Sequence, residues 1–443
     1  MPRNPVQPRD KNERNAEAKH ISMKQRTHNR NSRRTIASAW LVTAALAFAS
    51  TGWAQQPAPQ PGAPPRVFVL HADSLLALRA RVVAGDVYKP SLDSLRAEAN
   101  ELLKLEPLSV TQKPQFPPSR DKHDYMSLAP YWWPNPATPN GLPYIRRDGE
   151  TNPASAQVPD HKNFSKVMSA THTLVLAYYL LGDQAYSAQC AKLLRVWFLD
   201  PATRMNPSLT FAQAVIGRND GRGIGLIETR DITQILDAVG LLADSRVWTA
   251  ADQQGMQDWC SKFLNWMLNS SNGKDESAAK NNHGTYYDVQ IVALALFVGK
   301  KDIADRVLRE APKKRIELQV EPDGRQPLEL ERTKSAGYSL MNLSGLFELA
   351  RLGDATGADL WAFQSPDGRS IRKALDYLVP FATGERKWAG EQIADVKWTD
   401  LIPELLIAAD KYQSSSYKIA AMKIDPNVGQ SLDALLLHAR LQN

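Results

Sequence analysis

The chain has 443 residues, 43% of them hydrophobic, which is enough for one large domain or two ordinary ones. Its formal charge is +7, but residues 1–54 contain ten Lys and Arg against three acids. Subtracting these from the totals of 54 and 47 leaves 44 charges of each sign in the remainder. The basic character therefore belongs to the N-terminal segment, and general nucleic-acid binding loses its main support.

The N-terminal segment, residues 1–54, has the features of an export signal. A basic region ends at Arg33-Arg34, and the apolar run IASAWLVTAALAFAS follows. Gly52 and Ala54 occupy the −3 and −1 positions of a cleavage site after Ala54. The apolar run is short for a membrane span of roughly twenty residues, although an N-terminal anchor helix is the alternative. We therefore expect a periplasmic or secreted protein.

The residues after the signal divide into a linker and one domain. Residues 55–66, QQPAPQPGAPPR, predict a Pro-rich linker, and residues 67–443 predict a single domain. Cys190 and Cys260 stand in apolar helical contexts, so buried free thiols are expected and a disulfide is the alternative. No CxxC or HExxH motif occurs. No metal or other cofactor is therefore expected.

Helical periodicity recurs along nearly the whole domain. It covers residues 73–105, stops in a Pro- and aromatic-rich stretch at 122–153, and then resumes. The later predicted helices cover residues 163–181, 184–199, 230–244, 250–269, 285–298, 301–319, 339–352, 369–380, 398–411 and 430–441. Many helices arriving in pairs, without a tight repeat, predict an all-α fold. The expected architecture is an α/α toroid, an incomplete or closed barrel of helix pairs, with an open solenoid as the alternative.

Two polar stretches interrupt the helical pattern in the first half of the domain. The stretch HDYMSLAPYWWPNP contains Tyr131, Trp132 and Trp133, and flat indole faces suit the apolar faces of sugar rings. Anchoring of a loop in the core is the alternative for each of these residues. Residues 205–231 contain GRGIG, which follows no strand and matches no phosphate-binding motif. We expect four charged or polar residues of this segment either to line a groove or to form structural ion pairs: Gln213, Arg218, Glu228 and Arg230.

The stretch AAKNNHGTYYDVQ, residues 278–290, collects polar side chains in front of an apolar helix. Asn282 and His283 precede a helix expected at 285–298, with Thr285 as its cap and Gly284 allowing an unusual turn. A lone histidine in such a place is more often structural than functional. A fourth stretch, residues 324–350, contains Arg332 six residues before Tyr338. A surface salt bridge from the arginine to a neighbouring glutamate is the alternative there.

Together these stretches resemble the alginate lyase superfamily of polysaccharide lyases. The segments that carry the resemblance are NNHGTYYDVQ, ELERTKSAGYSLMNL, DYMSLAPYWWPNP, WFLDPATRMNPSL and YLVPFATGERKW, spread over roughly residues 120–400. The six-residue spacing of Arg332 and Tyr338 makes the sequence more similar to polysaccharide lyase family 38 than to family 5. The resemblance implies an α/α toroid that cleaves uronic-acid polymers by β-elimination.

The resemblance also implies catalytic roles. Asn282 and His283 would hydrogen-bond the uronate carboxyl group and stabilise the enolate-like charge. Tyr338 would remove the C5 proton and protonate the leaving O4, with Arg332 favouring the phenolate because the free pKa of tyrosine is near 10. Glucuronan or mannuronate-rich alginate is the implied substrate, cleaved by syn elimination without a metal. The implied substrate-binding residues are Tyr131, Trp132, Trp133, Gln213, Arg218, Tyr286 and Tyr287.

Two other functions remain open at this level. An α/α-barrel glycoside hydrolase needs two carboxylates beside the scissile bond, and Asp288 and Glu228 could supply them. A polysaccharide-binding protein without activity is the other alternative, although all four expected catalytic positions are filled. In each case the expected partner is an anionic polysaccharide, with no nucleic acid and no membrane after signal cleavage.

Overall fold

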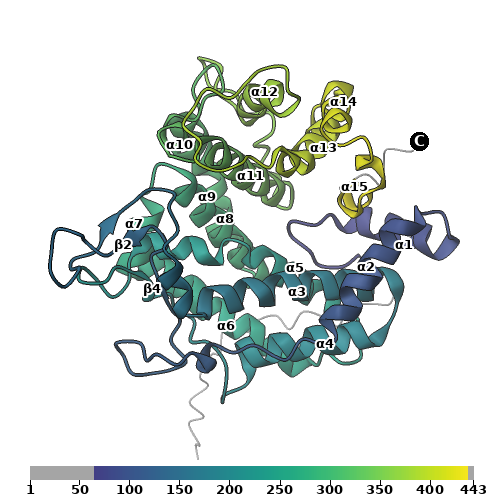
Figure 1. The fold of residues 1–443 in the computed structure, drawn as a ribbon. Helices are drawn as coiled ribbons and strands as arrows, with labels where there is room; N and C mark the ends of the chain where they lie inside the picture. The colour runs from purple at the N-terminus through teal and green to yellow at the C-terminus, as the bar shows by residue number, and fades with distance from the viewer. Residues whose placement is uncertain (1–63, 438–443) are drawn as a thin grey trace, which may run out of the picture. The chain divides into compact units, whose positions relative to one another are not determined.

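The computed structural model describes residues 64–437, so the expected export signal and most of the expected linker lie outside the described residues. All described residues belong to the second of two compact units, Pro57–Asn443. This unit is almost entirely helical (Figure 1). Its α-helices are α1 Ala72–Ala84, α2 Lys89–Leu102, α3 Asp160–Leu181, α4 Gln184–Leu194, α5 Ile232–Leu242, α6 Ala250–Asn269, α7 Ser271–Ser277, α8 Asn282–Phe297, α9 Lys301–Ala311, α10 Pro327–Leu330, α11 Ser335–Asp354, α12 Ile371–Ala382, α13 Ile402–Lys411, α14 Ser415–Ile424 and α15 Leu432–Leu437.

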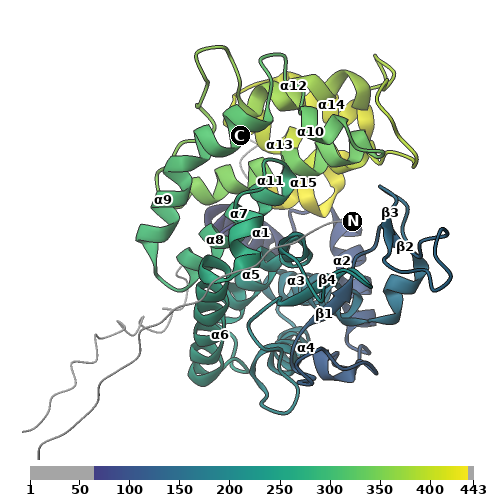
Figure 2. The same cartoon turned by 90° about the vertical axis from the view of Figure 1, so that its left-hand side faces the viewer.

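Short 3-10 and π segments join or extend these helices. They are η1 Val110–Gln112, η2 Pro153–Gln157, η3 Arg195–Leu199, η4 Gly223–Thr229, η5 Pro312–Glu317, η6 Trp398–Leu401 and η7 Val428–Gln430. Two small pairs of strands complete the described residues. β1 Met126–Leu128 runs parallel to β4 Phe211–Ala214, and β2 Trp132–Trp133 runs antiparallel to β3 Ile145–Arg146. In Figure 2 the pair β2 and β3 lies on the side of the unit opposite α9.

The helices pack against one another in a closed circuit. α3 contacts α5, α5 contacts α8, and α8 contacts α11. The circuit continues through α12, α13 and α15, and α15 packs against α1 and α2, which contact α3 again. α4, α9 and α14 pack outside the circuit on α3, α8 and α13. The fold is therefore an all-α toroid of helix pairs, as the sequence predicts.

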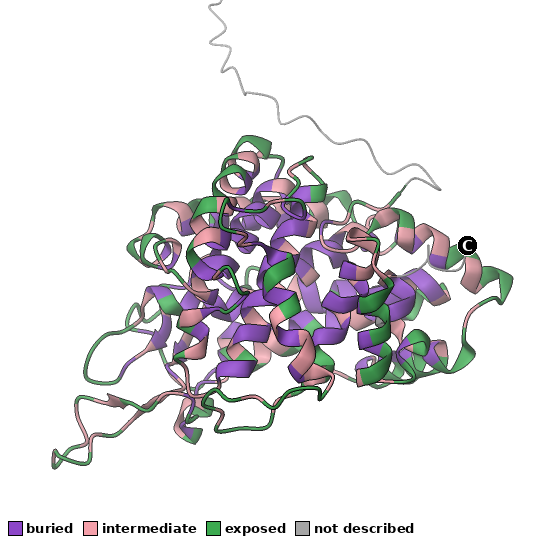
Figure 3. Cartoon of the chain, turned by 90° about the horizontal axis from the view of Figure 1, so that it is seen from above, coloured by how far each residue is buried: buried purple, intermediate pink, exposed green. Residues whose placement is uncertain are grey.

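Burial follows the position of each helix in this circuit. α8 is apolar on nearly every side, and almost all of its residues are buried. α9 has one narrow buried stripe and a charged outer face, as a helix with a single partner surface requires. Figure 3 shows the buried residues concentrated in the central helices, while loops and outer faces are exposed. The inner helices therefore form the core, and their ends carry the polar stretches noted above.

The start of α8 differs from the prediction. The helix begins at Asn282, three residues before the expected start, and Thr285 does not cap it because its hydroxyl donates to Gln319. The expected unusual turn at Gly284 is also wrong, since this residue lies inside the helix. A Cβ atom there would lie 2.1 Å from the carbonyl oxygen of Ala279 and 2.2 Å from Nη1 of Arg315. Gly284 is thus required for the close approach of these two groups and not for a turn.

Two further expectations concern the cysteines and the membrane. Cys190 and Cys260 are both free and buried, which confirms the prediction of buried thiols. Among residues 64–437, no helix is long and apolar enough to cross a membrane.

Candidate active site

The N-terminus of α8 brings Asn282 and His283 against two carboxylates. The backbone N–H and the Nδ2 amide of Asn282 donate to the two oxygens of Glu329, each over 2.7 Å. Nδ1 of His283 lies 2.7 Å from Oε1 of Glu276 on α7. Glu329 therefore caps α8 from another element, because it accepts one of the N–H groups that the first helical turn leaves free. This cap explains why the helix begins at Asn282.

The side chains of this pair differ in accessibility. Asn282 is fully buried, and its Oδ1 atom has no hydrogen-bond partner in the described structure. The His283 side chain is 15% exposed. The imidazole is therefore the member of the pair that a ligand can reach directly, while the amide lies beneath the surface.

Arg332 lies on the face of the Tyr338 ring, with its guanidinium carbon 3.7 Å from the ring centroid. Asp148 accepts hydrogen bonds from Nε and Nη2 of Arg332, at 3.0 Å and 2.8 Å, and from the backbone N–H of Thr333. Burial opposes ionisation of Asp148, but these hydrogen bonds outweigh it and hold the pKa of the carboxyl well below its usual range. Burial likewise opposes the charge on Arg332, yet the hydrogen bonds to Asp148 leave its pKa raised. The arginine is a fixed cation.

The hydroxyl of Tyr338 donates to the hydroxyl of Tyr131 over 2.9 Å. Burial raises the pKa of Tyr338, and the hydrogen bond to Tyr131 raises it further. Arg332 lowers this pKa, as the sequence predicts, but it does not offset the other two effects. Without a ligand, Tyr338 is therefore a neutral phenol, although Arg332 acts on its pKa in the expected direction.

Helix packing brings the four expected catalytic residues into one region. α8 packs on α11, which contains Tyr338, and α10 packs on the same helix. Glu329 of α10 hydrogen-bonds Asn282 and also interacts electrostatically with Arg332 and His283. The surface salt bridge considered for Arg332 does not form with the neighbouring glutamates, because its partner is Asp148, 184 residues earlier in the chain.

Two arginines flank the Trp132 ring beside this site. The guanidinium carbons of Arg218 and Arg222 lie 5.1 Å and 5.6 Å from the ring centroid. Arg218 donates to the carbonyl of Tyr144, and Arg222 donates to the backbone and side-chain oxygens of Gln213. In the described part of the chain, neither arginine has a carboxylate within ion-pair distance. Both positive charges are therefore available to an anion.

Gln213, which accepts the hydrogen bonds from Arg222, has a strained backbone conformation. Its φ of +50° lies in the left-handed region, which non-glycine residues rarely adopt. Its N–H donates to the hydroxyl of Ser127, and its side chain is buried. Strain of this kind is typical of functional sites, where the surrounding contacts maintain it. Gln213 thus supports the Arg222 side chain and is itself largely covered.

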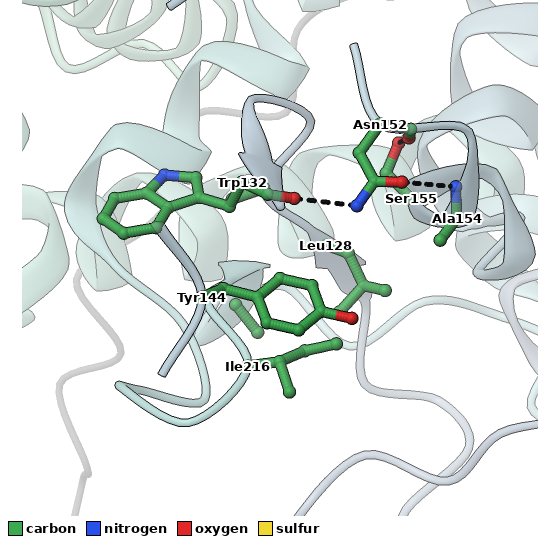
Figure 4. Close-up of a pocket in the computed structure, with 9 residues that line it drawn as sticks. Leu128, Trp132, Tyr144, Asn152, Ala154, Ser155 and Ile216 are labelled. Atoms are coloured by element: carbon green, nitrogen blue, oxygen red, sulfur yellow. Dashed lines mark hydrogen bonds between the residues drawn. The ribbon is translucent and has the colours of Figure 1, made fainter. Parts of the chain in front are cut away.

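The other two aromatic residues of this stretch have different surroundings. Trp133 is partly buried, its indole N–H donates to the carbonyl of Glu150, and Arg147 lies over its ring. Behind Trp132 is a cavity of about 10 Å³ (Figure 4). Figure 4 shows Tyr144 and Ile216 beside it, with the Asn152 amide donating to the Trp132 carbonyl. This cavity holds no more than a water molecule, so it cannot bind a sugar.

Tyr286 and Tyr287 do not occupy positions where a polysaccharide could bind, which corrects the prediction. Both are buried in α8. The hydroxyl of Tyr286 donates to the carbonyl of Met341, and that of Tyr287 donates to the carbonyl of Met267. Burial raises the pKa of Tyr287 to about 12. These tyrosines stabilise the packing of α8, since a buried hydroxyl needs a partner.

The carboxylates that a hydrolase would need are engaged elsewhere. Asp288 is buried and forms a two-pronged ion pair with Arg315, over 2.7 Å and 3.0 Å. Glu228 is buried and accepts hydroxyl hydrogens from Tyr125 and Ser127. Both acids therefore have structural partners. Arg230 pairs with the adjacent Asp231. The described residues also contain no group of three or more His, Cys, Asp or Glu arranged to hold a metal ion.

Sequence reasoning missed the carboxylates that hold the site together. Glu276, Glu329 and Asp148 each bind one expected catalytic residue, and Arg222 joins Arg218 at Trp132. Only Glu329 could have been noticed in the sequence, because it is an acidic residue three positions before Arg332. Asp148 and Glu276 stand in loops and short helices without periodicity, so their partners could not be inferred.

Comparisons with known proteins agree with this architecture. A profile of the alginate lyase family matches residues 109–388. The crystal structure of an alginate lyase from Bacteroides ovatus has a TM-score of 0.81 and 36% identity, covering 84% of this chain and 99% of that one. A variant of alginate lyase A1-III complexed with a tetrasaccharide has a TM-score of 0.53 and 15% identity, covering 86% and 98%. A second A1-III variant with a tetrasaccharide gives 0.51 and 14%, covering 85% and 97%. No curated protein matches the chain.

The chain belongs to the alginate lyase family. It is therefore a polysaccharide lyase with the all-α toroid fold of its structural neighbours. The closer assignment to polysaccharide lyase family 38 stays a prediction.

Proposed function

We propose that the protein cleaves mannuronate-rich alginate by a metal-independent syn β-elimination, with His283 and Asn282 on the substrate carboxylate and Tyr338 as base and acid. The observation that carries the proposal is the placement of Tyr338. Its ring lies against the fixed cation Arg332, and its hydroxyl donates to the hydroxyl of Tyr131. The chain that contains this arrangement belongs to the alginate lyase family. This arrangement provides a proton carrier beside a stabilised positive charge.

The first requirement of the reaction is neutralisation of the uronate carboxylate. The C5 hydrogen becomes acidic only when the charge that develops on the adjacent carboxyl group is stabilised. His283 can donate to this group directly, because its side chain is partly exposed. Contact with the fully buried Asn282 requires local movement of the residues that cover it. Such side-chain rearrangement at a binding surface is common.

The second requirement is a base for the C5 hydrogen. The pKa of Tyr338 is raised in the free enzyme by burial and by Tyr131. Displacement of the hydrogen bond to Tyr131 by the substrate removes one of these effects, and Arg332 then stabilises the phenolate. The same hydroxyl returns the hydrogen to O4 as the bond breaks. The C5 hydrogen is lost, the C4–O4 bond breaks, and a C4–C5 double bond forms.

A single Tyr that serves as base and acid requires the C5 hydrogen and O4 on the same face of the ring. Mannuronate and glucuronate satisfy this condition and differ only at C2, whereas guluronate is the C5 epimer of mannuronate. The proposal therefore ranks polymannuronate and glucuronan above polyguluronate. The names of the similar structures favour alginate as the natural polymer.

The wall formed by Trp132, Arg218 and Arg222 supports an anionic sugar chain as substrate. Indole faces stack on sugar rings, and guanidinium groups bind carboxylates through paired hydrogen bonds. Neither arginine has a carboxylate within ion-pair distance among the described residues, so the carboxylates of a polyuronate can pair with both.

One assay tests the proposal. Purified protein is incubated with polymannuronate, polyguluronate and glucuronan, and the ultraviolet absorbance of the C4–C5 double bond is followed beside the release of reducing ends. We expect both signals to rise together, fastest with polymannuronate. New reducing ends without absorbance would indicate hydrolysis. The absence of both signals with retained polymer binding would indicate a binding protein.

We also propose that the protein is exported. Support comes from the basic region, apolar run and cleavage site in residues 1–54. Expression of the full chain in a bacterial host and N-terminal sequencing of the exported product should give a chain that begins at Gln55. Retention of the uncleaved chain in the membrane fraction would favour the anchor alternative.

A further inference from the structure

Glu276 is a buried carboxylate whose only ion-pair partner in residues 64–437 is His283. Its side chain is 1% exposed, and Oε1 lies 2.7 Å from Nδ1 of the imidazole. In this part of the chain, no Lys or Arg lies within ion-pair distance of it. A buried carboxylate that depends on one imidazole is costly unless the pairing is maintained.

The fold places Glu276 under His283 by close packing of α7. This short helix packs against η4, α6 and α8. A Cβ atom on Gly273 would lie 1.7 Å from the carbonyl oxygen of Met267, and one on Gly223 would lie 2.8 Å from that of Asn272. Glycine at both positions therefore allows α7 to sit against its neighbours. The position of the carboxylate is determined by backbone packing and not by a flexible loop.

The contact fixes which ring nitrogen of His283 faces outward. A carboxylate accepts the Nδ1 hydrogen, so Nε2 is the nitrogen left for a ligand. The same arrangement orients histidines in catalytic triads and metal sites, where a carboxylate behind the ring sets its tautomer and direction. The imidazole stands between the buried acid and the surface, since His283 is more exposed than Glu276.

We propose that Glu276 is the positioning residue of His283: it holds Nδ1 and thereby presents Nε2 to the uronate carboxylate. This inference rests on the proposed function. The other charged groups around the pair are Arg222, which interacts electrostatically with Glu276, and Glu329, which interacts with His283. Neither comes within ion-pair distance of the pair, so the orientation of the ring depends on Glu276.

The test compares Glu276→Gln with the wild-type enzyme on polymannuronate. The amide keeps the volume of the carboxylate but lacks its charge, and its NH₂ group can face Nδ1. We expect kcat to fall about 10²-fold, as when one donor to a developing charge is misdirected, while KM changes less than about threefold. Glu276→Asp should recover part of the lost kcat because it restores the carboxylate. Glu310→Gln, an exposed position on α9, is the matched control and should have wild-type kinetics.

A spectroscopic measurement on the free enzyme accompanies the kinetics. With nitrogen-15 histidine, the His283 resonances are assigned from their loss in His283→Gln. The wild type should show a hydrogen held on Nδ1, and Glu276→Gln should lose this signature. Melting curves identify any variant that does not fold; if Glu276→Gln fails, Glu276→Asp carries the test through a reduced kcat with unchanged KM.

The possible outcomes separate the two proposals. An active wild type with a Glu276→Gln variant of equal kcat would overturn the positioning role and leave the proposed function intact. A rise in KM with unchanged kcat would also overturn it, because a positioning residue acts on the transition state. An inactive wild type on all three polymers would overturn the proposed function and this inference with it.

Discussion

Replacing Asp148 by Asn removes the charge that holds Arg332 against Tyr338. The Asp148 carboxylate accepts three hydrogen bonds from the guanidinium group of Arg332 and two from Thr333, through its N–H and its hydroxyl. It accepts one more from Arg146. The side chains of Asp148 and Arg332 are 21% and 14% exposed. An asparagine in this place has only one acceptor oxygen. Its NH₂ group would either face the N–H and O–H donors of Arg332 and Thr333 or turn away and leave about half of these hydrogen bonds unmade. The substitution therefore leaves a mostly buried cation without its partner.

Breaking a buried ion pair from one side costs about 3–5 kcal/mol, and exposed pairs contribute about 1 kcal/mol or less. Because this pair is mostly buried, we expect the free energy of unfolding to fall by about 3 kcal/mol. An unfolding entropy of about 2.1 cal/mol/K per residue gives roughly 0.8 kcal/mol per degree for a unit of this size, so Tm should fall by about 4 °C. Loss of the cation beside Tyr338 should also lower kcat about 10- to 100-fold.

Urea unfolding and initial rates on polymannuronate measure both effects. Asp323→Asn, which removes an exposed pair with Arg325, is the matched control and should change stability by less than about 0.5 kcal/mol. The pKa of Asp148 is lower in the folded chain than in the unfolded one, so its contribution exists above the ordinary carboxyl pKa. It is lost as the pH falls through the depressed folded value. An Asp148→Asn variant with wild-type stability and rate at neutral pH would refute the reasoning.

Three further substitutions test other parts of the account. Tyr338→Phe should reduce kcat at least about 10⁴-fold while costing about 1 kcal/mol of stability or less, because it removes one partly buried hydrogen bond; a variant with substantial turnover contradicts the assigned base. Arg222→Gln should raise KM for polymannuronate about tenfold with kcat changed less than about threefold, and an unchanged KM would remove Arg222 from the binding surface. Burial raises the pKa of Glu404 to about 7. Between about pH 4.5 and 7 the folded chain therefore binds more protons than the unfolded chain, and the free energy of unfolding falls as the pH rises through this window. Urea unfolding should therefore show that the free energy of unfolding of Glu404→Gln, relative to wild type, rises by about 2 kcal/mol between about pH 5 and pH 8. An equal difference between variant and wild type at the two pH values would refute this.

The fold was largely predictable because its information is local. Long amphipathic or apolar segments such as 163–181 and 250–269 became α3 and α6 with nearly the expected bounds. Short helices such as α7 and α10 were missed, since they contain seven and four residues and show too little periodicity. The start of α8 was misplaced because its cap, Glu329, lies 47 residues away in the chain.

The candidate site was only partly predictable. The resemblance identified four residues that the structure brings into one region. The hydroxyls of Tyr286 and Tyr287 suggested a polar surface, yet these residues continue a helix that is buried on nearly every side. The contact between Asp148 and Arg332 spans 184 positions, and that of Tyr131 with Tyr338 spans 207. Contacts of this kind depend on closure of the toroid and leave no pattern in the sequence.

The central claim is that this chain breaks a uronate polymer by elimination. The most direct measurement is mass spectrometry of the oligosaccharides formed from polymannuronate in water enriched in oxygen-18. Elimination uses no water, so the products should contain an unsaturated terminal residue and no heavy oxygen beyond that exchanged at reducing ends in a matched control. Products whose non-reducing terminal residue is saturated, and which are therefore one water heavier than the elimination products, would show hydrolysis and contradict the account.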